Sequence, residues 1–168
     1  MTTDLELSGS RREGLLLGAE GVLHNSYAKI HPRAAELIEM SRELCSHVIV
    51  ISIDPQFDTT PLARRAKGWG ATDIIQPRIQ HEPIQFLYRR GLEATKLPGA
   101  EVVGVESGKI GIQVLQELGI KAVGLRRPDD PESLTVDDRS NRVVKVVSSY
   151  EDLIRVLPKI IENRRRHG

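Results

Sequence analysis

The sequence predicts an α/β fold in which a mainly parallel sheet carries helices on both faces. Short runs rich in Val, Ile and Leu alternate along the chain with segments whose apolar residues recur at helical spacing. The β-rich runs show no clean polar alternation, which is typical of strands buried on both faces of a sheet. Strands that alternate with helices of this length imply right-handed crossovers between parallel strands. We therefore expect a three-layer, Rossmann-like domain.

The expected strands are short segments rich in branched apolar residues. They are residues 14–19, 47–53, 72–75, 101–105, 120–125 and 143–147. In open sheets of this kind, ligands bind beyond the carboxyl ends of the strands. The turns that should carry a site are therefore 18–25, 52–58, 76–82 and 105–111.

Helical spacing of apolar residues marks the segments between the strands. The expected helices are residues 32–45, 83–96, 108–118 and 149–163, with a further helix start at Thr59-Thr60-Pro61. Pro32 and Pro83 stand at first helical positions, and Gly119 is a natural helix stop. The polar stretch 126–142 is expected to be the longest loop.

Length and composition indicate one domain without an obvious charged partner. The 168 residues suit a single domain, 1–168, for which we expect flexible ends at 1–12 and 164–168. The net charge of +1 favours neither nucleic acid nor an acidic membrane as partner. A single cysteine, Cys45, excludes an internal disulfide and fits a reducing compartment. With no signal segment and no apolar run near the roughly 20 residues of a membrane span, we expect a cytoplasmic protein.

Motifs at the ends of the predicted strands occur in a characteristic order. They read Gly18-Ala-Glu-Gly-Val-Leu23, His31-Pro-Arg-Ala-Ala-Glu-Leu37, Val48-Ile-Val-Ile-Ser52, Gln80-His-Glu-Pro83 and Glu106-Ser-Gly-Lys-Ile-Gly-Ile112. In this order they resemble the haloacid dehalogenase (HAD) superfamily, and in particular its β-phosphoglucomutase-like phosphatases and mutases. The resemblance covers roughly residues 14–125. It implies a HAD core, whose chemistry passes a phosphoryl group to an aspartate before water removes it.

The chain departs from the family pattern at four functional positions. Where the resemblance places the nucleophilic aspartate, this chain has Gly18, which has no side chain to attack with. Glu20 replaces the aspartate that acts as acid and base, and its extra methylene would spoil alignment. Gln80 replaces the lysine, and Ser107 replaces the second acid of the magnesium motif. Only Ser52, a phosphate-binding hydroxyl in the family, is intact, so the phosphoaspartyl mechanism cannot run.

The remaining motif residues imply weak ligand binding at most. By the resemblance, Glu106 would be the one retained metal ligand. Magnesium prefers several oxygen ligands in a tight octahedron, so we expect no resident cofactor and only weak binding of Mg²⁺. Gly108 and Lys109 form a glycine turn at a helix start that could receive a phosphate. For His24, His31 and His81 we expect surface or capping roles, because no metal-binding spacing connects them.

The family's helical cap has no place in this chain. Residues 24–31 alone separate the first motif from the next helix, and one helix and one short strand fill the interval between Ser52 and Gln80. We therefore expect an open, capless site. Loss of both the nucleophile and the cap predicts a pseudoenzyme with a binding, regulatory or oligomeric role. Its partner would be another protein, a second copy of the chain or a phosphorylated small ligand, with Trp69 or Tyr88 as candidate contact residues.

Two alternatives remain open at this point. One is a residual or altered phosphatase, in which Glu20 or Asp54 activates water directly and Glu106 holds a metal. The other is a different Rossmann-like domain, of the receiver or nucleotide-binding type. The receiver alternative is weakened because no aspartate ends the strand at 47–52, and the nucleotide alternative lacks a Gly-x-Gly-x-x-Gly turn.

Overall fold

The computed structural model describes residues 13–25, 29–127 and 145–167. The segment 1–12, expected to be a flexible end, and most of the loop expected at 126–142 lie outside the described residues.

The described strands form one parallel sheet. In chain order they are β1 Gly14–Gly18, β2 His47–Ile51, β3 Asp73–Ile75, β4 Val102–Glu106, β5 Lys121–Leu125 and β6 Lys145–Val147. Their order across the sheet is β3-β2-β1-β4-β5-β6, and every neighbouring pair is parallel. The chain thus runs outward from β1 in one direction, then returns to β4 and runs outward in the other. The carboxyl ends of β1 and β4 form the switch point at which sheets of this kind bind ligands.

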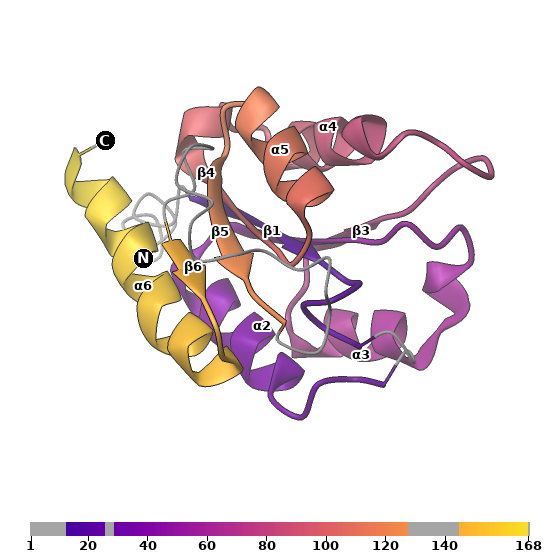
Figure 1. The fold of residues 1–168 in the computed structure, drawn as a ribbon, viewed down its shortest axis with the longest axis horizontal. Coiled ribbons are helices and arrows are strands. Elements are labelled where there is room, and N and C mark those ends of the chain that lie inside the picture. The colour runs from indigo at the N-terminus through magenta and orange to yellow at the C-terminus, as the bar shows by residue number, and fades with distance from the viewer. Residues whose placement is uncertain (1–12, 26–28, 128–144, 168) are drawn as a thin grey trace, which may run out of the picture.

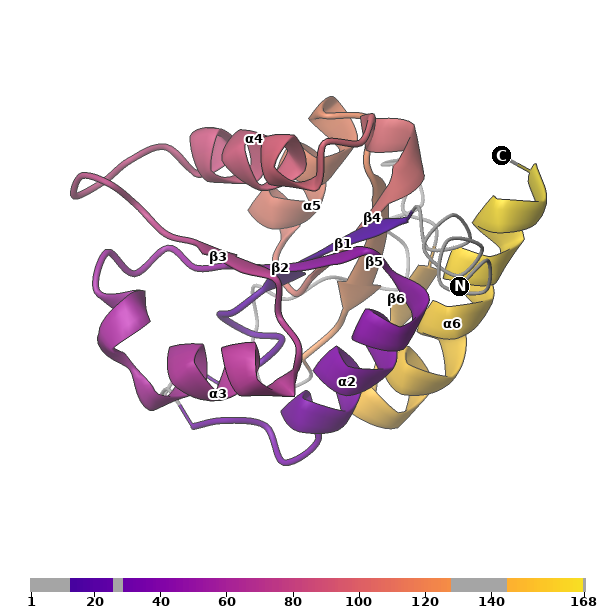
Figure 2. The same ribbon diagram turned by 180° about the vertical axis from the view of Figure 1, so that it is seen from behind.

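Helices cover both faces of the sheet, as predicted. They are α2 Ala34–Leu44, α3 Pro61–Trp69, α4 Ile84–Thr95, α5 Lys109–Glu117 and α6 Tyr150–His167. Two short 3₁₀ turns, Phe57–Thr59 and Gly99–Glu101, complete the regular structure of the described residues. Figure 1 shows α4 and α5 on one side of the sheet and α2, α3 and α6 on the other, and Figure 2 shows the same layers from behind.

The central strand β1 shows why polar alternation is missing from these sequences. Leu15 and Leu17 pack in the core beneath α2, α3 and α6, whereas Leu16 packs beneath α4 and α5. All three side chains are fully buried. Successive side chains of a strand point to opposite faces, so both faces must be apolar when helices cover both. Each such leucine contributes about 1.5–3 kcal/mol of burial free energy.

The connections between the strands hold no cap domain within the described residues. The described residues between β1 and α2, which begins at Ala34, form turns and isolated bridges, and between β2 and β3 the chain forms one 3₁₀ turn and α3. These dimensions fit a capless core. The helices of the described part of the chain include none that is long and apolar enough to cross a membrane.

The two aromatic residues considered as contact residues lie differently. Trp69, at the end of α3, is partly buried and packs against the core. Tyr88 on α4 is only 2% exposed, so it cannot supply a contact surface for another molecule. That part of the prediction is wrong, because position 88 faces the sheet beneath α4.

Candidate functional site

The candidate site lies at the switch point of the sheet. Gly18 is the last residue of β1, Ser52 follows β2, and Glu106 is the last residue of β4. Because β2, β1 and β4 are neighbours with parallel register, their carboxyl ends meet at one edge. The topology thus brings three of the predicted site residues to one place.

Glu106 turns inward and occupies the space next to Gly18. A β-carbon built on Gly18 would overlap Oε1 of Glu106 and lie 2.7 Å from its Cδ. On the other side, a β-carbon on Gly111 of α5 would overlap Oε2 of the same carboxyl group. The two glycines therefore enclose the Glu106 carboxyl, and only 8% of the residue is exposed. No side chain larger than hydrogen fits at position 18 while Glu106 keeps this conformation.

The buried environment keeps Glu106 protonated at neutral pH. Burial raises the pKa of its carboxyl to about 8, although a hydrogen bond with Tyr88 works in the opposite direction. The charge of Glu20 adds to the rise. Burial and the neighbouring Glu106 also raise the pKa of Tyr88 well above its ordinary value. At pH 7 a carboxyl group of this pKa is about nine-tenths neutral, and it is a poor ligand for a cation in that form.

Glu20, in contrast, is an ionised carboxylate held by several donors. The hydroxyl of Ser52 donates to its Oε2 at 2.7 Å, and the backbone N–H of Ile53 donates to Oε1 at 2.8 Å. His24 Nε2 lies 3.4 Å from Oε2. Burial alone would raise the pKa of Glu20, but the hydrogen bonds from His24, Ile53 and Ser52 outweigh it and lower the pKa. The hydrogen bond with Glu20 in turn raises the pKa of His24.

Ser52 is enclosed by the same contacts. Its side chain is fully buried, its hydroxyl donates to Glu20, and its Oγ accepts from the backbone N–H of Asp54 at 3.0 Å. Asp54 itself is exposed, and its Oδ1 accepts from the N–H of Gln56 at 2.9 Å, as a turn residue does. The hydroxyl that the family resemblance assigns to phosphate is therefore used within the protein.

Ser107 packs against the turn that follows β1. Its hydroxyl donates to the carbonyl oxygen of Glu20 at 3.4 Å. Gly21 in that turn has φ +89°, a conformation that favours glycine, and a β-carbon there would overlap Ser107 Oγ. The serine thus joins the β4 end to the first turn.

The other predicted site residues lie at the margin or away from this cluster. Gln80 lies in an exposed turn between β3 and α4, and this loop extends beyond the sheet on the right of Figure 1. No hydrogen bond within the described residues joins Gln80 to Glu20 or Ser52. Gly108 is the N-cap of α5, and Lys109, the first residue of that helix, is exposed.

The residues present do not fit the magnesium ion that the family resemblance implies. The described part of the chain contains no group of three or more His, Cys, Asp or Glu side chains placed to hold a metal. The Glu106 carboxyl is neutral and enclosed, and the Glu20 carboxylate already accepts hydrogen bonds from several groups. A magnesium ion needs several free oxygen ligands, which this cluster does not offer.

Sequence reasoning missed two residues that shape the site. Tyr88 bonds to Glu106, and Gly111 provides the space for its carboxyl group. Gly111 did leave a signal, because a glycine inside a helix costs stability and usually marks a close approach. Tyr88 left none, since an apolar stripe on a helix is most simply explained by core packing.

Comparison with known proteins identifies the fold. No protein-family model matches the sequence, and no curated protein matches it. Among solved structures, the cobalt-bound deoxy-D-mannose-octulosonate 8-phosphate phosphatase of Haemophilus influenzae matches with a TM-score of 0.59 and 14% identity, over 91% of this chain and 85% of that one. A protein of Thermotoga maritima assigned as a β-phosphoglucomutase matches with a TM-score of 0.67 and 13% identity, over 88% and 99%.

A HAD family hydrolase of Deinococcus radiodurans, solved with phosphate and sodium, matches with a TM-score of 0.59 and 17% identity. The match covers 77% of this chain and 59% of that one, so this chain spans about three fifths of that hydrolase. The chain therefore has the fold of the HAD-like hydrolases and phosphatases, β-phosphoglucomutase among them. The predicted α/β, three-layer HAD core with a parallel sheet and helices on both faces is confirmed.

Proposed function

We propose that this chain is a HAD-like domain that has lost the phosphoaspartyl mechanism and serves a binding, regulatory or oligomeric role. One observation carries the proposal. The Glu106 carboxyl group fills the space beside Gly18, where the nucleophile of the family would stand. Position 18 therefore lacks a nucleophilic side chain and also has no space for one while Glu106 keeps this conformation, which supports the proposed loss.

No other carboxylate in the cluster is placed to replace the nucleophile. Nucleophilic catalysis needs an ionised carboxylate with free access to phosphorus. Glu106 is neutral and enclosed, and both oxygens of Glu20 accept hydrogen bonds from the protein. The hydroxyl of Ser52 is likewise engaged. These contacts support a site that is stable without a substrate.

A residual phosphatase remains the second candidate because of one feature of Glu20. Its carboxylate is ionised, its side chain is 32% exposed, and it lies 3.4 Å from His24. A carboxylate beside a histidine is a pair that can activate water. Such an enzyme would attack phosphate directly with water and form no covalent intermediate.

Hydrolysis of p-nitrophenyl phosphate and of a panel of phosphosugars, with and without Mg²⁺, separates the two candidates. The wild-type chain is compared with Glu20→Ala, which also controls for a contaminating phosphatase. We expect the same background rate from both proteins, each shown to be folded by circular dichroism. Turnover by the wild type that Glu20→Ala abolishes would refute the loss of catalysis and favour the residual phosphatase.

A further inference from the structure

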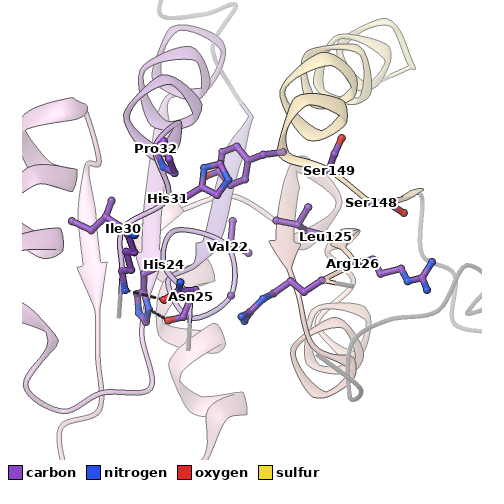
Figure 3. Close-up of a pocket in the computed structure, with 14 residues that line it drawn as sticks. Val22, His24, Asn25, Ile30, His31, Pro32, Leu125, Arg126, Ser148 and Ser149 are labelled. Atoms are coloured by element: carbon purple, nitrogen blue, oxygen red, sulfur yellow. Dashed lines mark hydrogen bonds between the residues drawn. The ribbon is translucent and has the colours of Figure 1, made fainter. Parts of the chain in front are cut away.

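A cavity lies beside the candidate site and is lined in part by the first turn. It has a volume of about 430 Å³. Its walls come from the turn after β1, the segment leading into α2, the end of β5 and the start of α6. Figure 3 shows His24, Asn25 and His31 on one side, and Leu125, Arg126 and Ser149 on the other. The residues that line this cavity are Gly21, Val22, His24, Asn25, Lys29, Ile30, His31, Pro32, Leu125, Arg126, Arg127, Ser148, Ser149 and Tyr150.

The cavity is distinct from the filled family site. Its lining contains none of Gly18, Glu20, Ser52 or Glu106. The two places adjoin at the first turn, where His24 lines the cavity and also contacts Glu20. A ligand in the cavity would therefore leave the Glu106 carboxyl where it is.

The described lining contains basic residues but no acidic ones. The basic residues of the lining are Lys29, whose side chain is exposed, Arg126 and Arg127, and no Asp or Glu is among the described residues that line the cavity. The chain as a whole is almost neutral, with 24 basic and 23 acidic residues, so the excess of basic residues is local to the cavity. The backbone N–H of Arg126 donates to the carbonyl of Val147 at 2.7 Å, which fixes the end of β5 beside the start of α6. Cations gathered in a concave surface attract anions.

The amino-terminal end of α6 adds further donors. This helix of 18 residues begins at Tyr150, and Ser148 and Ser149 line the cavity just before it. Ser149 Oγ accepts from the N–H of Asp152 at 3.0 Å, which caps the helix. Helix amino termini carry unpaired N–H groups and partial positive charge. The nearby Asp152 does not line the cavity and pairs with Arg155 at 3.0 Å.

A buried donor without a partner belongs to one of the residues that line the cavity. Tyr150 lines the cavity and is only 7% exposed, yet its hydroxyl has no hydrogen-bond partner among the described residues. Its ring stacks on His31 with centroids 3.7 Å apart. His31 Nδ1 accepts from the N–H of Arg33, which leaves the other ring nitrogen of the neutral imidazole as a donor. An unsatisfied buried donor costs about 1–3 kcal/mol, which a ligand oxygen would recover.

We propose that this cavity binds a small ligand through a phosphate group. Phosphate supplies several strong acceptor oxygens and negative charge, which match cations, serine hydroxyls, a tyrosine hydroxyl and a helix amino terminus. The volume is in the range of small-molecule sites, so the ligand is a phosphorylated metabolite or free phosphate. Binding here goes beyond the proposed function, because it does not depend on whether the neighbouring site has lost catalysis.

Calorimetric titration of the full chain tests the proposal, with inorganic phosphate and glycerol 3-phosphate as probes and glycerol as the uncharged control. We expect both phosphate probes to bind and glycerol not to bind. Tighter binding of glycerol 3-phosphate would identify a phosphate ester, and equal affinities would identify free phosphate. Absence of binding by either phosphate probe at millimolar concentration would overturn the proposal.

Variants locate the binding. Lys29→Gln and Tyr150→Phe should each weaken phosphate binding about tenfold, the loss of one charge-assisted or one hydroxyl hydrogen bond. Tyr150→Phe removes an unpartnered hydroxyl, so it should not lower the melting temperature. Arg64→Gln, an exposed position on α3 outside the cavity, is the matched charge control and should leave the affinity unchanged. If Ser52→Ala abolishes binding while Lys29→Gln and Tyr150→Phe do not, phosphate binds at the family site and the proposal is refuted.

Discussion

Replacement of Glu106 by glutamine should change how stability depends on pH. In the folded chain the carboxyl has a pKa of about 8, against an ordinary value of 4.5. Between these two pH values the folded state holds a proton that the unfolded chain releases. The stabilising contribution is therefore fully present below about pH 4.5, and it is lost as the pH rises to about 8. At about 1.4 kcal/mol for each pH unit, the loss over the whole window amounts to about 5 kcal/mol.

Glutamine is a suitable probe because it is close in shape to the protonated acid and does not titrate. It keeps an acceptor for the Tyr88 hydroxyl and stays within the space between the two glycines. Other groups whose pKa is shifted, such as His24 and His31, are present in both proteins. The difference between wild type and Glu106→Gln therefore isolates the carboxyl group.

Urea unfolding at pH 5.5, 6.5 and 7.5, followed by circular dichroism, measures this difference. We expect the wild type to lose stability relative to Glu106→Gln by about 1 kcal/mol for each pH unit in this range. Parallel pH profiles for the two proteins would contradict this prediction, because they would mean that residue 106 is ionised and solvated in the folded chain.

Two further predictions concern the metal and the first turn. Addition of about 10 mM MgCl₂ should raise the melting temperature by less than about 1 °C, because the described cluster offers no free set of oxygen ligands. A rise of several degrees would contradict this. Gly21→Ala should lower the free energy of unfolding by about 1–3 kcal/mol, because φ is +89° and the new β-carbon overlaps Ser107 Oγ. Gly68→Ala, at a helical position with open space around it, is the matched control and should be neutral or slightly stabilising in the same urea titration.

The fold could be predicted from the sequence because its signals are local and repeated. The run Leu15-Leu16-Leu17 is apolar on both faces of the strand. This pattern is needed only where helices cover the sheet on both sides. The position of Gly18, Ser52 and Glu106 at one edge of the sheet could also be predicted from the sequence, because parallel strands bring their carboxyl ends together.

The arrangement of side chains within the site could not be predicted in the same way. The direction in which Glu106 turns depends on space left by Gly18 and Gly111, which are far apart in the sequence. The same is true of the bond between Ser52 and Glu20, which the family resemblance gave no reason to expect. The roles of Gln80 and of the phosphate-binding residues stay predictions, because a motif fixes a place in the chain but not the length and course of its loop.

The cavity could not be predicted from the sequence, for a related reason. Its walls combine the first turn with residues from the end of β5 and the start of α6, about a hundred residues further along the chain. No single motif contains Lys29, Arg126 and Tyr150, so only the folded arrangement reveals that these residues line one cavity.

A double-mutant cycle between positions 18 and 106 tests most directly that Glu106 has taken the nucleophile's place. The free energy of unfolding is measured for wild type, Gly18→Ala, Glu106→Ala and the double variant. Gly18→Ala alone introduces the overlap with Glu106, and Glu106→Ala removes the overlapping atoms. We predict that the double variant is more stable than the sum of the single effects implies, by about 1–3 kcal/mol. Effects that add to within about 0.5 kcal/mol would show that the two residues do not share one space, and would contradict the account.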